Sequence, residues 1–354
     1  MNKKIVFAAV VAGFALPFAA HADVKVYGAA QSELVSGSDD APDATADQIF
    51  SRAGTGDNKG TAITAGQDSV SEEDDARGRI GVKASEDLGN GLKGIAKFEY
   101  RTDTTDNVGK GTLVLAPRDS MVGLKGGFGT VMMGRLKSPY KYTGGVKYDK
   151  LVTTAMEARG NGGMSNGAYG HSGFLDKTIG WNSPKMSGVQ VKLNYRLDEG
   201  GTNGEAAGQY ALAVEYANGP INAFVATIDR DDHDGNGQNY SAVKVGGAYT
   251  TGPINVRLQY EMITNENIAA ATDDGKEGDE TILFLGFTYK MGKSSVVVQF
   301  GQNTVDGNNF NDVTYIALAL WHKLSKSTSA WIGYRSTSDV EGVIAIGMRK
   351  GFSS

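Results

Sequence analysis

The sequence predicts an all-β fold, a closed antiparallel barrel of sixteen strands. Three observations predict it. Apolar and polar side chains alternate in segments of about ten residues, and the connections between these segments alternate between short and long. After residue 22 there is no apolar run long enough for a membrane-spanning helix. Period-two alternation is typical of a strand with two unlike faces. A sheet closed on itself pairs all its backbone groups, so it can cross a membrane without helices.

Alternation is clearest at 189–198 and 254–262. In the second segment, Ile254 and Val256 begin an apolar face, and Arg257 lies on the polar face. Only alternate residues of a barrel strand touch lipid, so this pattern predicts transmembrane strands around a polar interior. A soluble β-sandwich would also show alternating apolar and polar side chains, but its short and long connections would not need to alternate strictly along the chain.

The connections give the strand count and the sidedness. Short connections rich in glycine or proline are typical of tight hairpin turns, whereas the longer connections are mostly polar. The seven short ones lie at 88–91, 126–129, 184–188, 218–220, 251–253, 292–293 and 323–326. The eight long ones lie near 36–75, 105–117, 137–175, 199–208, 231–239, 264–279, 304–312 and 339–342. Sixteen strands follow, with both termini and the short turns on the periplasmic side and the long loops outside.

The two ends of the chain fit an exported barrel. Residues 1–22 combine Lys3 and Lys4, an apolar stretch and a small-x-small triplet that ends at Ala22, which is typical of a secretory signal peptide. We expect cleavage near Ala22, a barrel domain at 23–354 and localisation in the outer membrane of a Gram-negative cell. The final segment, 343–352, alternates and ends in the aromatic Phe352, as a closing strand requires.

The sequence resembles the general, non-specific trimeric porins of Gram-negative bacteria, of the neisserial and related proteobacterial type. The matching segments are DVKVYG at 23–28, SEDLGNGLK at 85–93, GRLKSP at 134–139, WNSP at 181–184 and GMRKGF at 347–352. The resemblance implies a homotrimer of sixteen-stranded barrels in which the third loop folds inward and forms a constriction. Two departures are Ser353 and Ser354 after the closing aromatic residue, and a long, acidic first loop.

The third loop, 137–175, is long enough to be functional. If it folds inward, its charges face the basic residues on the polar side of the second and third strands. Fixed charges across a narrow aqueous gap orient dipolar solutes and sort ions by sign. The candidate constriction residues are Arg77, Arg79, Lys83, Lys97 and Arg101 on the wall, and Asp149, Glu157 and Arg159 on the loop. Any one of these charges could instead only hydrate the lumen far from the narrowest point.

The acidic excess lies mainly outside the predicted pore. The chain has 35 Lys and Arg against 40 Asp and Glu, and segment 36–75 alone contains ten of the acidic residues but only two basic ones. Screening over about 8 Å at physiological salt limits the influence of distant charges on the pore. We therefore expect weak anion preference. Acidic loops near 229–234 and 273–280 could bridge to lipopolysaccharide through divalent cations, or could simply be solvated.

Other classes of function receive less support. There is no cysteine, and His171, His233 and His322 show no spacing to a nucleophile or metal partner, so we expect no catalysis, metal or cofactor. Segment 232–243 begins like a calcium loop but has Val243 where a bidentate Glu is needed. A substrate-selective channel and, less favoured, an outer-membrane protease or lipase remain alternatives. The expected partners are outer-membrane lipid, lipopolysaccharide, small hydrophilic solutes and ions, without nucleic acid.

Overall fold

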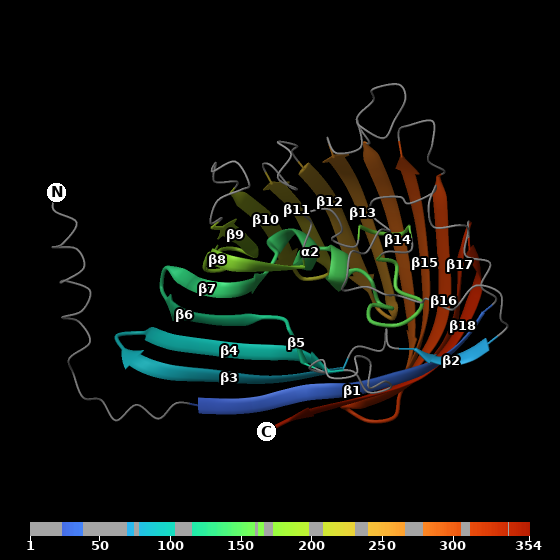
Figure 1. Cartoon of the computed structure of the whole chain (residues 1–354), viewed down its shortest axis with the longest axis horizontal. Coiled ribbons are helices and arrows are strands. Elements are labelled where there is room, and N and C mark those ends of the chain that lie inside the picture. The colour runs from blue at the N-terminus through green and yellow to red at the C-terminus, as the bar shows by residue number, and fades with distance from the viewer. Residues whose placement is uncertain are drawn as a thin grey trace.

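The computed structural model describes residues 23–37, 69–73, 78–102, 115–159, 162–165, 173–197, 208–230, 240–265, 279–305, 312–338 and 340–354. Within these ranges, eighteen strand segments form one sheet (Figure 1). They are β1 (Asp23–Gly37), β2 (Ser69–Glu73), β3 (Gly78–Gly89), β4 (Leu92–Thr102), β5 (Leu115–Pro117), β6 (Ser120–Gly126), β7 (Gly129–Lys137), β8 (Phe174–Asn182), β9 (Val189–Arg196), β10 (Gln209–Asn218), β11 (Ile221–Arg230), β12 (Tyr240–Thr251), β13 (Ile254–Asn265), β14 (Glu280–Met291), β15 (Ser294–Val305), β16 (Val313–Lys323), β17 (Thr328–Thr337) and β18 (Val340–Ser353). Between β7 and β8 lie α2 (Pro139–Tyr142) and the 3-10 turn η2 (Gly145–Lys147).

Neighbouring strands pair antiparallel around a closed ring. Both β2 and β3 pair with β1, and both β5 and β6 pair with β4, so each of these two sets is one barrel strand with an interruption. Counted in this way, the described ranges form sixteen barrel strands, and the predicted fold class is confirmed. No helix in the described part of the chain is long and apolar enough to cross a membrane.

The ring closes where β1 meets β18. The pairing runs from Tyr27 opposite Ser353 to Ser36 opposite Ile344. Ser354 continues this seam: its backbone N–H donates to the Val26 carbonyl (2.9 Å), and its Oγ accepts from the Val26 N–H (3.0 Å). The two serines after the closing aromatic residue therefore extend the last strand pair.

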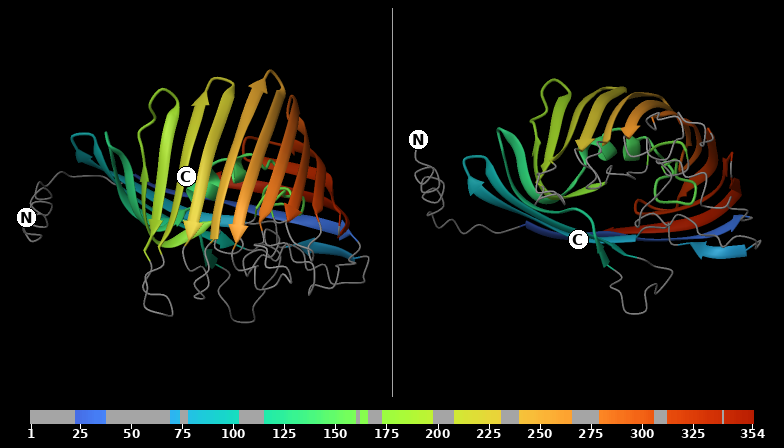
Figure 2. Two further views of the ribbon diagram at one scale, coloured as in Figure 1. Left: turned by 90° about the horizontal axis from the view of Figure 1, so that it is seen from above. Right: turned by 45° about the horizontal axis from the view of Figure 1, so that its top comes forward.

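The short connections are the tight turns that the sequence predicts. Between β3 and β4 only Asn90 and Gly91 intervene, with φ angles of 52° and 76°. Two successive residues with positive φ match the twist of a hairpin, and Asn-Gly is the pair that adopts them most easily. Figure 2 shows these turns gathered at one end of the barrel.

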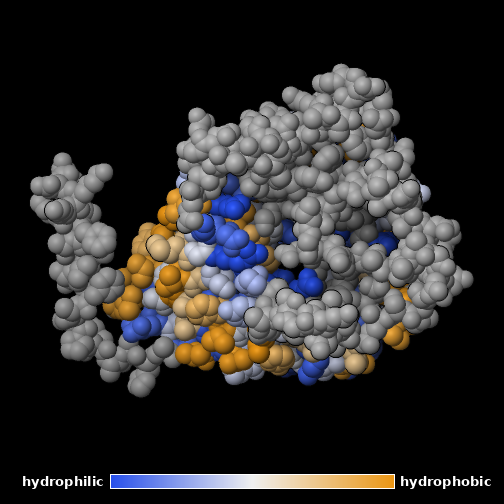
Figure 3. All heavy atoms as spheres, viewed as in Figure 1, coloured by the Kyte–Doolittle hydropathy of each residue, from blue (hydrophilic) through white to orange (hydrophobic). Residues whose placement is uncertain are grey.

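The two faces of each strand separate as the alternation predicts. On β13, Val256 and Leu258 are exposed outward, whereas Arg257, Gln259 and Glu261 are buried on the inner face. The same parity places other large apolar side chains outside, and Figure 3 shows them along the outer wall, with hydrophilic residues toward the lumen. An apolar outside and a polar inside are what a lipid-embedded channel requires.

Candidate functional site: the lumen at loop 3

Loop 3, defined here as residues 138–173, connects β7 and β8, and its described residues lie inside the barrel (Figure 2). Its apolar side chains Tyr140, Leu151 and Met156 are completely buried. They belong to one apolar cluster with inward-facing wall residues such as Phe224 and Phe284. Burial of large apolar side chains stabilises such a contact by roughly 1.5–3 kcal/mol each. Loop 3 is therefore packed against the inner wall of the barrel.

Hydrogen bonds fasten the first half of loop 3 to β13 and β15. Tyr140 Oη donates to Glu261 Oε2 (3.1 Å), and the Gly145 N–H donates to Gln259 Oε1 (2.7 Å). The Lys150 N–H donates to Gln299 Oε1 (2.7 Å). A buried backbone N–H that lost such a partner would cost about 1–3 kcal/mol.

The second half of loop 3 is fastened to β16 and β1. Tyr315 Oη donates to the Met156 carbonyl (2.6 Å), and the Ala155 N–H donates to Glu33 Oε1 (2.6 Å). At Gly163 the loop backbone lies against Gly301, where a Cβ would overlap the Gly163 Cα. The described residues of loop 3 thus follow the inner wall from β9 around to β1 and leave the wall of β3, β4 and β6 uncovered.

The three predicted loop charges form an internal cluster. Asp149, Glu157 and Arg159 are 1%, 5% and 4% exposed. Asp149 accepts from the backbone N–H groups of Leu151 (3.0 Å) and Ala158 (2.9 Å), and Arg159 Nη2 pairs with Glu157 Oε2 at 2.8 Å. These side chains hold the loop in shape, and their direct contact with permeating solutes stays a prediction.

The ionisation of loop 3 follows from its burial. Burial and the neighbouring Glu157 raise the pKa of Asp149, while hydrogen bonds from Gln299 and Leu151 oppose that rise. The surrounding wall removes part of the water around Lys150, although its side chain still reaches the solvent surface. This desolvation lowers the pKa of Lys150 to about 8, and the positive charge of Arg257 adds to the effect. Lys147 and Lys150 are the loop charges here that are exposed to solvent. The described surface of the loop therefore presents basic groups, while the predicted Asp149, Glu157 and Arg159 lie in its interior.

On the uncovered wall, the predicted basic residues share one face. Arg79 lies opposite Arg101, and Lys83 lies opposite Lys97, across the β3–β4 pair. Lys83 and Lys97 also flank the ring of Tyr27, with ammonium groups 5.7 and 5.8 Å from its centroid. The fifth predicted residue, Arg77, lies outside the described residues. The structure thus brings four of the five predicted wall residues together.

Two carboxylates are embedded in this basic wall. Asp119 Oδ2 lies 2.6 Å from Lys97 Nζ and 3.7 Å from Lys137 Nζ. Glu99 accepts from Arg118 Nε (3.0 Å), and its Oε2 lies 3.4 Å from Lys97 Nζ. These pairs neutralise part of the wall and hold its long side chains in fixed positions.

Sequence reasoning missed other basic groups near the same wall. Arg349 of β18 lies within electrostatic range of Arg79 and Arg118. The parity of the closing strand could have identified Arg349, because Ile344 and Ile346 define its outward face. Arg118 lies in the interruption between β5 and β6, where no periodicity is available.

Trp321 and Trp331 both face inward. They lie opposite each other on β16 and β17 and stack with ring centroids 4.4 Å apart and an interplanar angle of 9°. Trp331 Nε1 donates to Glu33 Oε2 (3.2 Å). The alternation in the sequence does not give this direction, because β16 and β17 have apolar residues at both parities.

Comparison with known proteins identifies the family. A family model described as Gram-negative porin matches residues 8–341. The chain belongs to this family. It is 27% identical to major outer membrane protein P.IB of Neisseria gonorrhoeae over 346 residues, which covers 90% of this chain and 89% of that protein. P.IB of Neisseria meningitidis serogroup B / serotype 15, strain H44/76, is also 27% identical, with 87% and 96% covered.

Solved porin structures share the fold. The anion-selective porin from Comamonas acidovorans superposes with a TM-score of 0.72 at 18% identity, covering 94% of this chain and 100% of that one. OmpF of Salmonella typhi, solved in complex with daunomycin, gives 0.68 at 14% identity, covering 93% and 97%. With the family membership and the wet, charged lumen, the conclusion is plain. This porin is an outer-membrane channel for passive diffusion.

Proposed function

We propose that this porin is a general diffusion channel with a preference for anions, and that its constriction lies between loop 3 and the basic wall of β3 and β4. One observation carries the proposal: loop 3 is fastened along β9–β17 and β1, so the remaining passage runs past Arg79, Lys83, Lys97 and Arg101.

The loop contributes in two ways. Asp149, Glu157 and Arg159 set the shape of the constriction from inside the loop, and Lys147 and Lys150 supply its exposed charge. Fixed positive charge in a narrow aqueous gap between low-dielectric walls raises the local anion concentration and repels cations. Acidic loops more than about a Debye length away are screened and do not cancel this field.

One solved porin of the same fold is described as anion-selective. The test is the reversal potential of single channels in a planar bilayer under a KCl gradient. We expect the sign that corresponds to chloride permeation. A reversal potential of the cation-selective sign would contradict the proposal.

We further propose that transport involves no turnover and little recognition of individual solutes. Liposome swelling with a size series of neutral sugars should fall smoothly with molecular size; a sharp departure for one sugar would favour a substrate-selective channel. Incubation with peptide and phospholipid substrates should release no product. Hydrolysis in that experiment would favour a barrel enzyme.

We also propose a homotrimer embedded in lipid and lipopolysaccharide, with the mature chain beginning at Asp23 after cleavage near Ala22. The support is the family membership, together with a similar fold in the trimer form of OmpT of Vibrio cholerae. Chemical cross-linking in detergent should give a ladder that ends at three chains, and bilayer recordings should close in three equal steps. N-terminal sequencing of the purified protein checks the cleavage position.

A further inference from the structure

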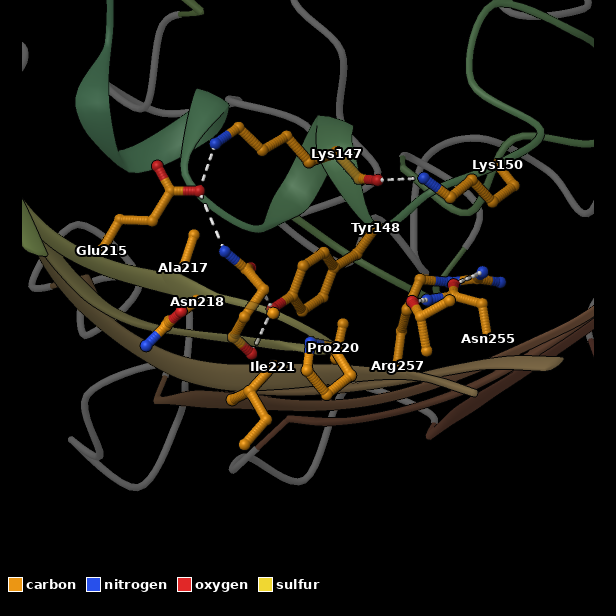
Figure 4. Close-up of a pocket in the computed structure, with 14 residues that line it drawn as sticks. Lys147, Tyr148, Lys150, Glu215, Ala217, Asn218, Pro220, Ile221, Asn255 and Arg257 are labelled. Atoms are coloured by element: carbon orange, nitrogen blue, oxygen red, sulfur yellow. Dashed lines mark hydrogen bonds and ion pairs between the residues drawn. The ribbon is translucent and has the colours of Figure 1, made fainter. Parts of the chain in front are cut away.

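Two adjoining cavities lie between loop 3 and the short-turn end of β10–β15. The first has a volume of about 450 Å³ and is lined by Lys147, Lys150, Glu215 and Arg257, among others (Figure 4). The second, of about 420 Å³, is lined by residues that include Lys290 and Trp321. Lys150, Thr250 and Asn255 line both cavities, so the two form one continuous recess with Lys150 at its centre.

The recess has an excess of positive charge. Its one lining carboxylate, Glu215, already pairs with Lys147 and with Lys192 Nζ, the latter at 2.8 Å. In the described part of the chain, no carboxylate lies within ion-pair distance of Lys150, Arg257 or Lys290. Figure 4 shows Lys150 reaching from loop 3 on one side of the cavity and Arg257 rising from the strands on the other.

Arg257 is built into the wall of the recess. It is 1% exposed, and its Nη1 donates to Asn255 Oδ1 (2.5 Å) and Thr288 Oγ1 (2.8 Å). Its Nε and Nη2 find no hydrogen-bond partner among the described residues. The side chain lies over Gly286, where a Cβ would come within 2.6 Å of Nε. Asp149 is near enough to stabilise its charge but is not in ion-pair contact with it. A buried cation with no carboxylate in direct contact is costly, so its retention in a preformed position favours a function in binding anions.

Lys150 supports the same interpretation independently of Arg257's burial. Its Nζ is held by the Lys147 carbonyl (2.8 Å), which directs it toward the recess. Its lowered pKa reflects burial and then the positive charge of Arg257, with a further contribution from Lys290, while Asp149 opposes the change. Arg257 and Lys290 are therefore both close enough to repel Lys150, and an anion placed among these groups would relieve that repulsion.

We infer that this recess is a binding subsite, entered from the short-turn end, for small solutes that carry two or more negative charges on carboxylate or phosphate groups. Lys150 and Lys290 contact the oxyanion, and Asn255, Thr250 and Thr288 offer polar groups beside it. Arg257 supplies fixed positive charge behind them. Multiple charges are preferred because three cations surround the space. The inference rests on the proposed anion-preferring channel and adds to it a discrete site away from the β3–β4 wall.

The test is block of the KCl current in planar bilayers by inorganic phosphate and, in a separate arm, by citrate. Each is added to one side of the membrane at a time. For the wild-type protein we expect saturable block by at least one of the two anions, with a lower half-blocking concentration from the short-turn side. The double variant Lys150→Gln/Lys290→Gln should raise that concentration by about tenfold, since it removes two charged contacts.

The matched control is Lys293→Gln/Lys326→Gln. Both lysines are exposed in short turns at the same end of the barrel and line neither cavity, and the change in net charge is the same. The control should retain the wild-type block. Equal block in all three proteins, equal weakening in the control, or no saturable block by either anion in the wild type would overturn the inference.

The same recordings separate the subsite from the channel. Conductance in KCl alone and the sign of its reversal potential report on the proposed function. The control variant should keep both at the wild-type values. Lys150→Gln/Lys290→Gln should keep the sign set by the β3–β4 wall but show a smaller anion preference, because Lys150 also supplies charge to loop 3. Loss of block with conductance preserved supports the subsite. Block by phosphate alone or by citrate alone identifies which group the subsite accepts.

Discussion

At the residue scale, Asp149 shows how a charge in a pore loop can act without facing the pore. Sequence position and charge placed it at the constriction, but alternation does not apply to an irregular loop, so its direction could not be predicted. The structure shows it accepting from Leu151, Ala158 and Gln299 Nε2, the last at 2.9 Å. Its carboxylate thereby joins two parts of loop 3 to β15.

Removal of that carboxylate should loosen the loop. Asp149→Ala leaves two backbone N–H groups and the Gln299 amide without their acceptor, which should destabilise the docked loop by on the order of 3 kcal/mol. We expect noisier open-channel current and a higher mean conductance in planar bilayers. Asp87→Ala is the control, because Asp87 is an exposed carboxylate that accepts from the Gly89 N–H in a short turn. Unchanged noise and conductance in Asp149→Ala would contradict this role.

Lys150 should make the channel sensitive to mildly alkaline pH. Its pKa of about 8 means that it is charged below pH 8 and neutral above it. The ionisable groups facing it are Asp149, Arg257 and Lys290, and the arginine keeps its charge throughout this range. Anion preference, measured by reversal potential from pH 6.5 to 9.5, should therefore fall as pH rises through about 8. Lys150→Met should lack this step; an identical pH profile in that variant would assign the step to another group.

At the scale of elements, the regular strands could be predicted and the irregular segments could not. The alternation on β13 gave the correct faces for Arg257 and Gln259, because a lipid-facing strand has few ways to hide a charge. The directions of Trp321 and Trp331 could not be predicted in this way. An indole is compatible with either face, and β16 and β17 have apolar residues at both parities. Loop 3 supplies the reason for that composition: its own apolar side chains need an apolar inner wall.

The seam between β1 and β18 offers an element-scale prediction. Deletion of Ser353 and Ser354 removes the hydrogen bonds to Val26, at about 1 kcal/mol each. We expect a lower midpoint of thermal unfolding, followed by the gel-mobility shift of the heated barrel. Ser354→Ala removes the Oγ contact but keeps the backbone one, so it should lie between the deletion and the wild type. A deletion variant as stable as the wild type would show that the seam is complete without these residues.

At the scale of the whole molecule, the position of charge matters more than its sum. The chain has a net charge of −5, yet the described inner wall beside loop 3 is rich in basic groups. Composition alone would suggest a cation-preferring pore. Strand parity corrects this, because it separates the lumen-facing residues from those in the loops.

Neutralising basic residues inside the lumen should therefore change ion selectivity, whereas neutralising basic residues on the outer surface should not. Arg79→Gln/Lys83→Gln should lower the anion-to-cation permeability ratio roughly twofold to threefold, equivalent to about 0.5 kcal/mol. Lys326→Gln/Lys350→Gln removes the same charge from the exposed surface and should leave the ratio unchanged. The measurement is the reversal potential in matched KCl gradients. Equal shifts in the two double variants would place selectivity in the net charge of the protein.

The contacts of loop 3 also bear on how the molecule assembles. Its partners extend from Glu33 at one end of the chain to Tyr315 near the other, separated from the loop by 122 and 159 positions. Contacts that distant in sequence form late, because each requires the intervening chain to be ordered first. Loop 3 can dock against the inner wall only after β1 and the strands near the C-terminus have paired. A newly inserted barrel should accordingly pass through a wide, weakly selective state, and the appearance of selectivity would mark the completion of folding.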